Sequence, residues 1–498
     1  MKKVKIFSAV LVFFTAQSLF SQNINSLIQQ GLNKAYNLEI DSAEKIFNKI
    51  IDLYPQKPHG YYHVAQLHFW LYLGTRDPGE YLVFLKFAEL AQEKIDKVLD
   101  DDKDNYAISY IAGNLSSFKA MAHATNDATV DAFWASKKAV GYYEQTLELN
   151  PKYYDAYLGL GLFDYAMSFV PDFLKWAVNL TGLSSDKARG LRYIKTAYKK
   201  GHEQTEAAFH LTKIYTDYLA DYDSAYFYIR SAISQYPKNT LFHYQHAVTL
   251  IKDKKLDQAL EELNTVIRLN NKKILQITAL AYFRKGEIYF KKNQFNTALK
   301  NFEKFLNTSK ELDFVGIASY HAAICNKMLK NDSEYEHYLT YAKSGNQDIF
   351  EDSYAKEKAE KYSEREISPA DLKLIKFKNY IDAGKSKTAL DSLTLFLKNG
   401  NDPGLKYLAS AYLSEAALNL NRFSDALSHC SELSKADPEN EKWVVPFGNL
   451  ICAKANLGLG NREEARNYLA KAEDENSYEF QDKIQAQIEN LKRKLKKK

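Results

Sequence analysis

The sequence predicts an all-α protein built as a solenoid of antiparallel helical hairpins, and three observations support this. Glycine and proline are scarce, with 20 and 10 in 498 residues, which disfavours an all-β fold with many tight turns. An alanine followed four residues later by a larger side chain recurs along the chain, and a proline follows several of these pairs. A chain of 498 residues with such a repeat is better explained by stacked hairpins than by one compact core.

The first 21 residues have the organisation of a secretory signal peptide. Basic "MKKVK" precedes a short apolar run, Ile6 to Phe14, and Ser21 is a small residue ahead of a cleavage point. The apolar run is too short to span a bilayer, so we favour removal over the alternative, a single N-terminal anchor. No cysteine follows it to carry a lipid. We therefore expect export, to the periplasm or cell envelope rather than the extracellular medium. Removing 1–21 lowers the formal charge from +5 to +2, which gives nucleic-acid binding no electrostatic basis.

The clearest copy of the repeat lies in "AYFRKGEIYFKKNQFNTALKNFEKFL". It places Tyr282, Gly286 and Tyr289 on a first helix and Ala298 and Phe302 on a second, with "KKNQF" as the polar turn. Small residues at 286 and 298 allow the two helices to approach closely, while the aromatic residues fill the space between hairpins. This spacing resembles the tetratricopeptide repeat. The resemblance implies a right-handed superhelical solenoid whose first helices line a concave groove.

The repeat recurs in step along the chain. In four copies the alanine and the proline are twelve residues apart: Ala43 and Pro55, Ala139 and Pro151, Ala225 and Pro237, and Ala426 and Pro438. The proline ends the second helix before the next hairpin starts. Four further copies carry Ala259, Ala298, Ala389 and Ala465.

Between residues 155 and 197 the repeat is interrupted. Gly161 belongs to a first helix, but Pro171 and Gly182 bound an extra apolar helix at about 170–184, which carries Trp176. Charged residues inside this stretch exclude a membrane span. The expectation is a widened hairpin, whose second helix is capped by Ser184 or Ser185.

This interrupted segment resembles the family of the yeast inclusion-body clearance protein and the animal tetratricopeptide-39 proteins. The residues that carry the resemblance are Gly159, Gly161, Pro171, Phe173, Leu174, Gly182, Leu183, Asp186, Gly190 and Leu191. It extends over about 30–310 and implies a superhelical repeat protein without a catalytic residue to transfer. Those relatives are intracellular, whereas this chain carries an export signal, so their cellular roles are not transferred.

Two arrays follow the signal peptide. The first spans 22–345 and includes the inserted helix. The highly charged segment 346–368 is predicted to be an exposed linker or hinge helix. The second array spans 369–498 and ends in a basic tail of Lys492, Arg493, Lys494, Lys496, Lys497 and Lys498. This tail is expected to be the solvated end of a last helix; contact with an anionic membrane, phosphate or an acidic partner is the alternative.

No catalytic, cofactor or metal signature is present, so we expect a non-enzymatic protein without cofactors. His59, His63 and His68 are better explained as packing residues than as zinc ligands, and His243 and His246 likewise. "LDDDKDN" lacks the glycine and glutamate of a calcium loop and is expected to be a turn. His202–Glu203 has no nameable partner. An enzyme with an unrecognised site would need clustered, strongly perturbed titratable groups in one cleft, and the sequence shows none.

The cysteines form no disulfide framework. Cys325 stands alone. Cys430 and Cys452 fall in neighbouring predicted helices, where a disulfide bond between them is the alternative. Both also occupy apolar packing positions, so buried thiols are the favoured interpretation.

The predicted function is therefore a scaffold that binds a protein or peptide partner. The groove positions that follow from the repeat are Tyr165, His210, Asp217, Tyr244, Glu287, Phe290 and Lys291, to which the inserted helix adds Trp176. Against this, several of these side chains would simply pack against neighbouring hairpins. The alternative function is a binding module for a glycan or lipid, held in an aromatic groove under the inserted helix.

Overall fold

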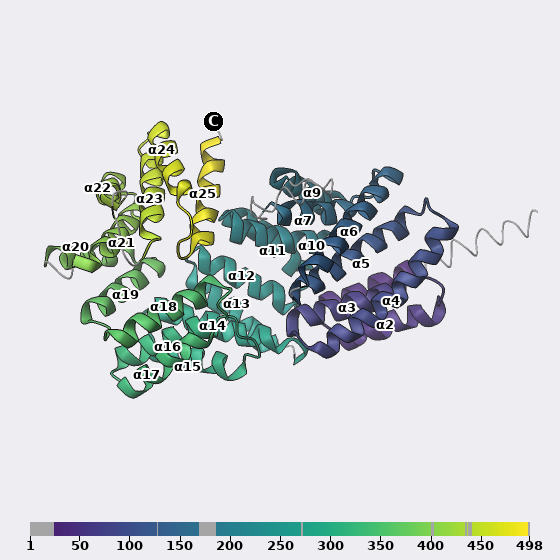
Figure 1. The fold of residues 1–498 in the computed structure, drawn as a ribbon, viewed down its shortest axis with the longest axis horizontal. Helices are drawn as coiled ribbons and strands as arrows, with labels where there is room; N and C mark the ends of the chain where they lie inside the picture. Colours follow the sequence, from purple (N-terminus) through teal and green to yellow (C-terminus); the bar gives the residue numbers. More distant parts are fainter. Residues whose placement is uncertain are drawn as a thin grey trace, which may run out of the picture. The chain divides into compact units, whose positions relative to one another are not determined.

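A computed structural model describes residues 24–126, 128–168, 186–269, 272–399, 403–433, 436 and 441–496 (Figure 1). Every regular element in these ranges is helical, which confirms the predicted all-α class. The predicted signal peptide, the inserted helix with Trp176, and Lys497 and Lys498 lie outside the described residues.

The helices gather into two compact units. Unit 1 comprises residues up to 211 with 231–239 and 271–274, and unit 2 comprises 212–230, 240–270 and 275–498. Unit 1 contains α2 (Ile40–Leu53), α3 (His59–Thr75), α4 (Pro78–Asp101), α5 (Tyr106–Thr125), α6 (Thr129–Leu149), α7 (Ala156–Met167), α9 (Lys187–Lys200) and the 3-10 helix η2 (Lys272–Ile274). Helix α10 (Gln204–Lys213) starts in unit 1, and α11 (Tyr222–Gln235) is divided between the units.

Unit 2 contains the longer series of helices. They are the π-helix η1 (Ile214–Tyr218), α12 (Thr240–Lys252), α13 (Leu256–Leu269), α14 (Leu275–Lys291), α15 (Phe295–Thr308), α16 (Val315–Leu329), α17 (Asp332–Tyr341), η3 (Ala342–Ser344), α18 (Phe350–Glu364), α19 (Pro369–Asp382), α20 (Ser386–Lys398), η4 (Pro403–Leu405), α21 (Lys406–Asn419), α22 (Phe423–Leu433), α23 (Val444–Gly458), α24 (Arg462–Asp474) and α25 (Gln481–Lys496).

Consecutive helices pack as hairpins in both units. Helices α3 and α4, α5 and α6, α14 and α15, and α23 and α24 form such pairs. In the α14–α15 pair, a Cβ atom on Gly286 would lie 2.6 Å from the Phe302 ring, and Ala298 is fully buried. The predicted close approach at these two small residues is therefore confirmed. Helices α2, α6 and α11 end two residues before Pro55, Pro151 and Pro237, as the repeat predicts.

Helices α7 and α9 pack against each other as the two arms of the widened hairpin. A Cβ atom on Gly161 would lie 2.8 Å from the carbonyl oxygen of Gly190, and one on Gly190 would lie 2.7 Å from that of Gly161. The backbones therefore meet at these two glycines. The cap of α9 is Asp186, whose carboxylate accepts from the amides of Ala188 and Arg189, so the predicted serine cap is wrong.

The segment predicted as an exposed linker or hinge is packed into unit 2. Residues 350–364 form α18, which lies against α16 and buries Ala355, Ala359 and Tyr362. No unit boundary falls at 346–368. The charged side chains misled the prediction because several of them find partners elsewhere in unit 2. Ser368 and Pro369 do start a helix, α19, through a reciprocal cap with Asp371.

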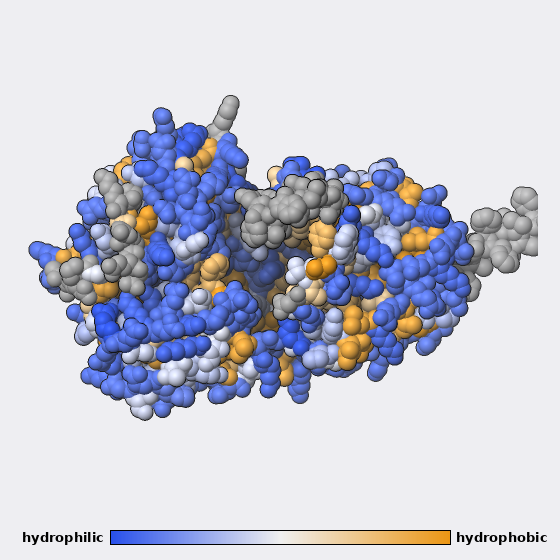
Figure 2. Space-filling view, viewed as in Figure 1, coloured by the Kyte–Doolittle hydropathy of each residue, from blue (hydrophilic) through white to orange (hydrophobic). Residues whose placement is uncertain are grey.

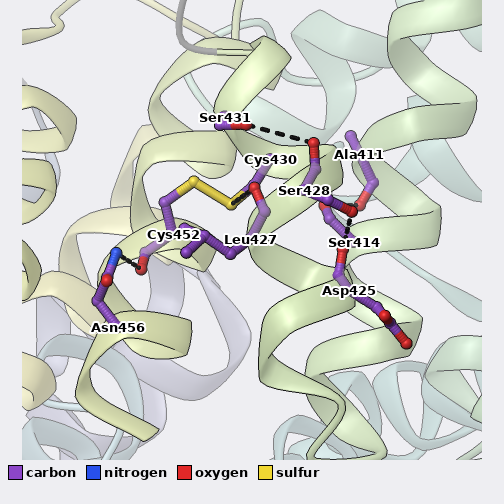
Figure 3. The surroundings of a disulfide bond; sticks show 9 residues. All are labelled: Ala411, Ser414, Asp425, Leu427, Ser428, Cys430, Ser431, Cys452 and Asn456. Carbon is purple, nitrogen blue, oxygen red and sulfur yellow. Dashed lines mark hydrogen bonds between the residues drawn. A yellow bond between two sulfur atoms is a disulfide. The ribbon is translucent and has the colours of Figure 1, made fainter. Parts of the chain in front are cut away.

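Cys430 on α22 and Cys452 on α23 form a disulfide bond, and both residues are fully buried (Figure 3). The favoured interpretation as buried thiols was therefore wrong for this pair, and it holds only for Cys325. An apolar position accommodates a free thiol and a disulfide-bonded cysteine equally well, so the sequence pattern did not distinguish the two states.

Candidate binding faces

The predicted groove residues of unit 2 form a network of charged and aromatic side chains. Arg284 donates through Nε to the Tyr244 hydroxyl at 3.3 Å and through its terminal nitrogen to Glu287 at 2.6 Å. The side chains of Arg284 and Glu287 are 18% and 16% exposed. Burial would raise the pKa of Glu287, but the charges of Arg284 and Lys291 outweigh it and hold that pKa below its usual range.

The network continues from α14 onto α19 and α21, which pack in succession. Lys378 forms ion pairs with Asp382 and, at 3.4 Å, with Glu415, and Lys254 also pairs with Glu415 at 3.1 Å. Burial lowers the pKa of Lys291, although Asp382 and Glu287 oppose that effect. We call Arg284, Glu287, Lys291, Lys378, Asp382 and Glu415 the charge ladder.

Two of the predicted groove residues face the interior instead. Phe290 stacks on His321 with the ring centroids 4.5 Å apart, and it is buried in the core. Tyr165 is also buried. The prediction that these two side chains line the groove was therefore wrong. An aromatic residue at either position packs against the neighbouring helices, as the alternative interpretation held. Asp217 lies on η1 in an ion pair with Lys252 at 2.7 Å, and His210 is half-buried on α10 of unit 1.

Unit 1 contains a site that sequence reasoning missed. Glu203, just before α10, and Glu206, in its first turn, are half-buried. Asp155 accepts from the backbone amides of His202 and Glu203 at 2.6 and 2.9 Å, so the "His202–Glu203" loop does have a partner.

The two glutamates have strongly perturbed acidity. Burial, followed by the charges of Glu206 and Asp155, raises the pKa of Glu203 well above its usual value. Burial also raises the pKa of Glu206 to about 7, although a hydrogen bond from Tyr36 opposes this. This is the kind of clustered, perturbed group that the sequence did not show, because its members come from distant helices. We call Glu203 and Glu206 the acid pair.

Neither a metal-binding cluster nor a membrane-spanning helix is found among the described residues. No group of three His, Cys, Asp or Glu side chains there is placed to hold a metal ion. Asn105 caps α5 within the acidic turn that resembles a calcium loop. Among the described helices, none combines the length and the apolar composition of a membrane span.

The basic tail is partly engaged in packing within unit 2. Arg493 on α25 pairs with Asp221 at 3.2 Å and covers the Tyr215 ring, while Lys492 pairs with Glu473. Lys494 and Lys496 are exposed. On the face shown in Figure 2, hydrophobic residues form scattered patches within a mostly hydrophilic surface.

Comparison with known proteins finds a family model that matches part of the chain. The model of the family Iml2/Tetratricopeptide repeat protein 39 matches residues 155–377, a segment that includes the α7–α9 hairpin and the α14–α15 repeat. This segment is similar to tetratricopeptide-repeat proteins of that family. The match includes the residues around Gly161 and Gly190 on which the sequence resemblance to this family rests. No curated protein matches the chain.

Several solved structures are similar to the chain at low sequence identity. The apo form of the quorum sensor NprR from B. thuringiensis is 13% identical, and the match covers 91% of this chain and 99% of that one with a TM-score of 0.32. YrrB, described as a tetratricopeptide-repeat protein with an unusual peptide-binding site, is 18% identical, with coverage of 43% and 92% and a TM-score of 0.30. A tetratricopeptide-repeat protein from Parabacteroides merdae is 13% identical, with coverage of 58% and 99% and a TM-score of 0.26.

Proposed function

We propose that this chain is an exported, non-enzymatic scaffold of the cell envelope, and that it binds a protein partner along the charge ladder of unit 2. The observation that carries the proposal is the ladder itself. Its charges come from α14, α19 and α21, they include both signs, and they remain partly accessible. Such a row offers both donors and acceptors to an extended segment and sets its register through charge complementarity.

The state of the charged groups favours recognition over catalysis. Arg284, Glu287, Lys378, Asp382 and Glu415 are held in mutual ion pairs. Ion pairing holds the carboxylates ionised and the basic groups protonated, so proton transfer near neutral pH gains nothing from them.

Two features support export. The signal-peptide pattern of residues 1–21 is one. The other is the disulfide between Cys430 and Cys452, since such bonds persist in oxidising compartments and are rare in reducing ones.

The test is crosslinking in intact native cells with the tagged full-length chain, followed by fractionation of cytoplasm and envelope. Lys291→Gln removes one charge from the ladder without breaking an ion pair that the structure shows, and its matched control is Lys387→Gln with Asp391→Asn on the exposed face of α20. We expect a discrete crosslinked species in the envelope fraction. Its amount should fall about tenfold in Lys291→Gln and stay unchanged in the control, because the loss of a charge from a recognition surface weakens binding affinity by about that factor. A cytoplasmic chain, or one whose crosslinks are the same in all variants, would overturn the proposal.

A further inference from the structure

The acid pair of unit 1 has no counter-ion of its own. In the part of the chain that the structure describes, no lysine or arginine forms an ion pair with Glu203 or Glu206. Their near neighbours are tyrosines, amides and Asp155. Unit 2 differs in this respect, since each carboxylate of its charge ladder has a lysine or arginine beside it.

Hydrogen-bond donors from three other helices hold the pair in place. The Tyr36 hydroxyl donates to Glu206 at 2.8 Å, and the Gln66 amide lies 3.5 Å from the same oxygen. On the other side, Asn114 of α5 faces Glu203. These donors favour the ionised carboxylates, yet burial still outweighs them in raising both pKa values.

The Tyr110 hydroxyl at this site lacks a hydrogen-bond partner. The Tyr110 residue is only 6% exposed, and its buried hydroxyl has no hydrogen-bond partner of ordinary geometry. Its pKa is raised well above the usual value by burial and then by the charge of Glu203, which places the hydroxyl next to that carboxylate. A buried hydroxyl without a partner costs free energy unless something else at the site satisfies it.

The accessible edge of the site is aromatic. Tyr36 lies with its ring centroid 5.6 Å from that of Trp70 and 4.8 Å from that of Tyr236, and both Tyr36 and Trp70 are half-buried. Aromatic faces bind the aliphatic stem of a basic side chain and also attract its cationic head. The site therefore combines a negative interior with an aromatic rim.

We propose that a lysine or arginine side chain of a partner protein enters this site, with its cationic head between Glu203 and Glu206 and its stem against Tyr36 and Trp70. A cation there supplies the missing counter-charge. Its N–H groups also offer a donor to the Tyr110 hydroxyl oxygen, which otherwise has no hydrogen-bond partner. This inference rests on the proposed function as a protein-binding scaffold, and it adds a second contact point with a defined chemical preference.

Binding should also depend on pH. The titratable groups that face the acid pair are Tyr36, Tyr62, Tyr110, Tyr143, Tyr153 and Asp155, none of which supplies a positive charge. The basic group nearest to them is His202, whose exposed ring pairs through Nδ1 with Asp155 at 2.9 Å and not with either glutamate. Because the cation binds the ionised carboxylates, affinity should rise as pH increases through the pKa of Glu206, which is about 7.

The experiment uses the full chain without residues 1–21 and fluorescent nonapeptide pools with random flanks and blocked ends. The fixed central residue is lysine, arginine, norleucine or citrulline, the last two being neutral counterparts of the first two. The test variant is Glu203→Gln with Glu206→Gln, and the matched control is Glu144→Gln with Glu148→Gln, two exposed glutamates of α6. Thermal unfolding checks that each variant folds, which we expect because the test variant removes a repulsion.

We expect the lysine and arginine pools to bind at least about tenfold more tightly than their neutral counterparts at pH 8. This preference should shrink at pH 5.5, disappear in the test variant and persist in the control. A preference that survives in the test variant but is lost in Lys291→Gln would overturn this inference and leave the proposed function standing. A loss in test and control alike would mean non-specific charge attraction. The absence of any preference would likewise overturn the inference, while the crosslinking experiment continues to decide the proposed function.

Discussion

Glu206 is half-buried and has no basic partner among the described residues, whereas Glu287 lies beside two basic side chains. The pKa values of these two glutamates therefore shift in opposite directions. Burial raises the pKa of Glu206 to about 7, whereas Arg284 and Lys291 overcome burial and lower that of Glu287. A carboxyl whose pKa is raised in the folded state binds more protons there than in the unfolded chain. Its effect is that the free energy of unfolding falls as pH rises from 4.5 to about 7.

Replacing Glu206 by glutamine should therefore stabilise the unliganded protein at alkaline pH. We expect Glu206→Gln to raise the melting midpoint by about 5 °C at pH 8, corresponding to about 2 kcal/mol once the partial exposure of the side chain is allowed for. At pH 4, where the native carboxyl is protonated, the gain should vanish. Differential scanning calorimetry at pH 4, 6 and 8 measures both, with Glu148→Gln on the exposed face of α6 as control. Equal midpoints for Glu206→Gln and the native chain at pH 8 would contradict the account.

The sequence drew attention to His202–Glu203 but offered it no partner. The reason is distance along the chain: Asp155 is 47 residues from His202, and Tyr36 is 170 residues from Glu206. Periodicity locates the helices, but it does not say which polar side chains from separate hairpins converge.

Within a hairpin, glycines have opposite roles according to what surrounds them. A side chain on Gly286 would meet the fully buried Phe302 ring at 2.6 Å, while one on Gly141 of α6 would meet nothing within 4 Å. We expect Gly286→Ala to destabilise the protein by about 1–2 kcal/mol, since overpacking exceeds the gain in helix propensity. Gly141→Ala should stabilise it by about 0.5–1 kcal/mol. Thermal unfolding of both variants decides the matter, and stabilisation by both would mean that the α14–α15 contact is looser than the structure shows.

Local spacing predicted such contacts well, because residues of one repeat lie on two helices joined by a short turn. It predicted the close approach at Gly286 and Ala298, the ends of α2, α6 and α11, and the pairing of α7 with α9 across the interruption. It did less well where one pattern suits two states. Cys430 and Cys452 occupy apolar positions whether or not they are bonded.

For unit 2 as a whole, α18 is a structural connection rather than a hinge. Asp352 is fully buried and accepts from the backbone amides of Ile317 and Asn346 at 2.8 and 2.9 Å. Lys358 pairs with Glu441, and Glu351 pairs with Lys483 at 3.0 Å. The sequence interpretation failed here because a highly charged helix was expected to be solvated, whereas these charges are matched by partners far along the chain.

Limited proteolysis with trypsin distinguishes a packed α18 from a hinge. The segment 346–368 offers Lys356, Lys358, Lys361 and Arg365 as cleavage points, and a hinge would be cut there first. We expect these bonds to resist cleavage in the native chain, because proteolysis follows the population of the locally opened state. Asp352→Asn weakens two charge-assisted hydrogen bonds and should accelerate cleavage in this segment by about tenfold or more. Asp348→Asn, an exposed aspartate four residues away, should leave the rate unchanged. Early cleavage of the native chain between 356 and 365 would instead restore the two-array interpretation, with α18 as the hinge between independently folded halves.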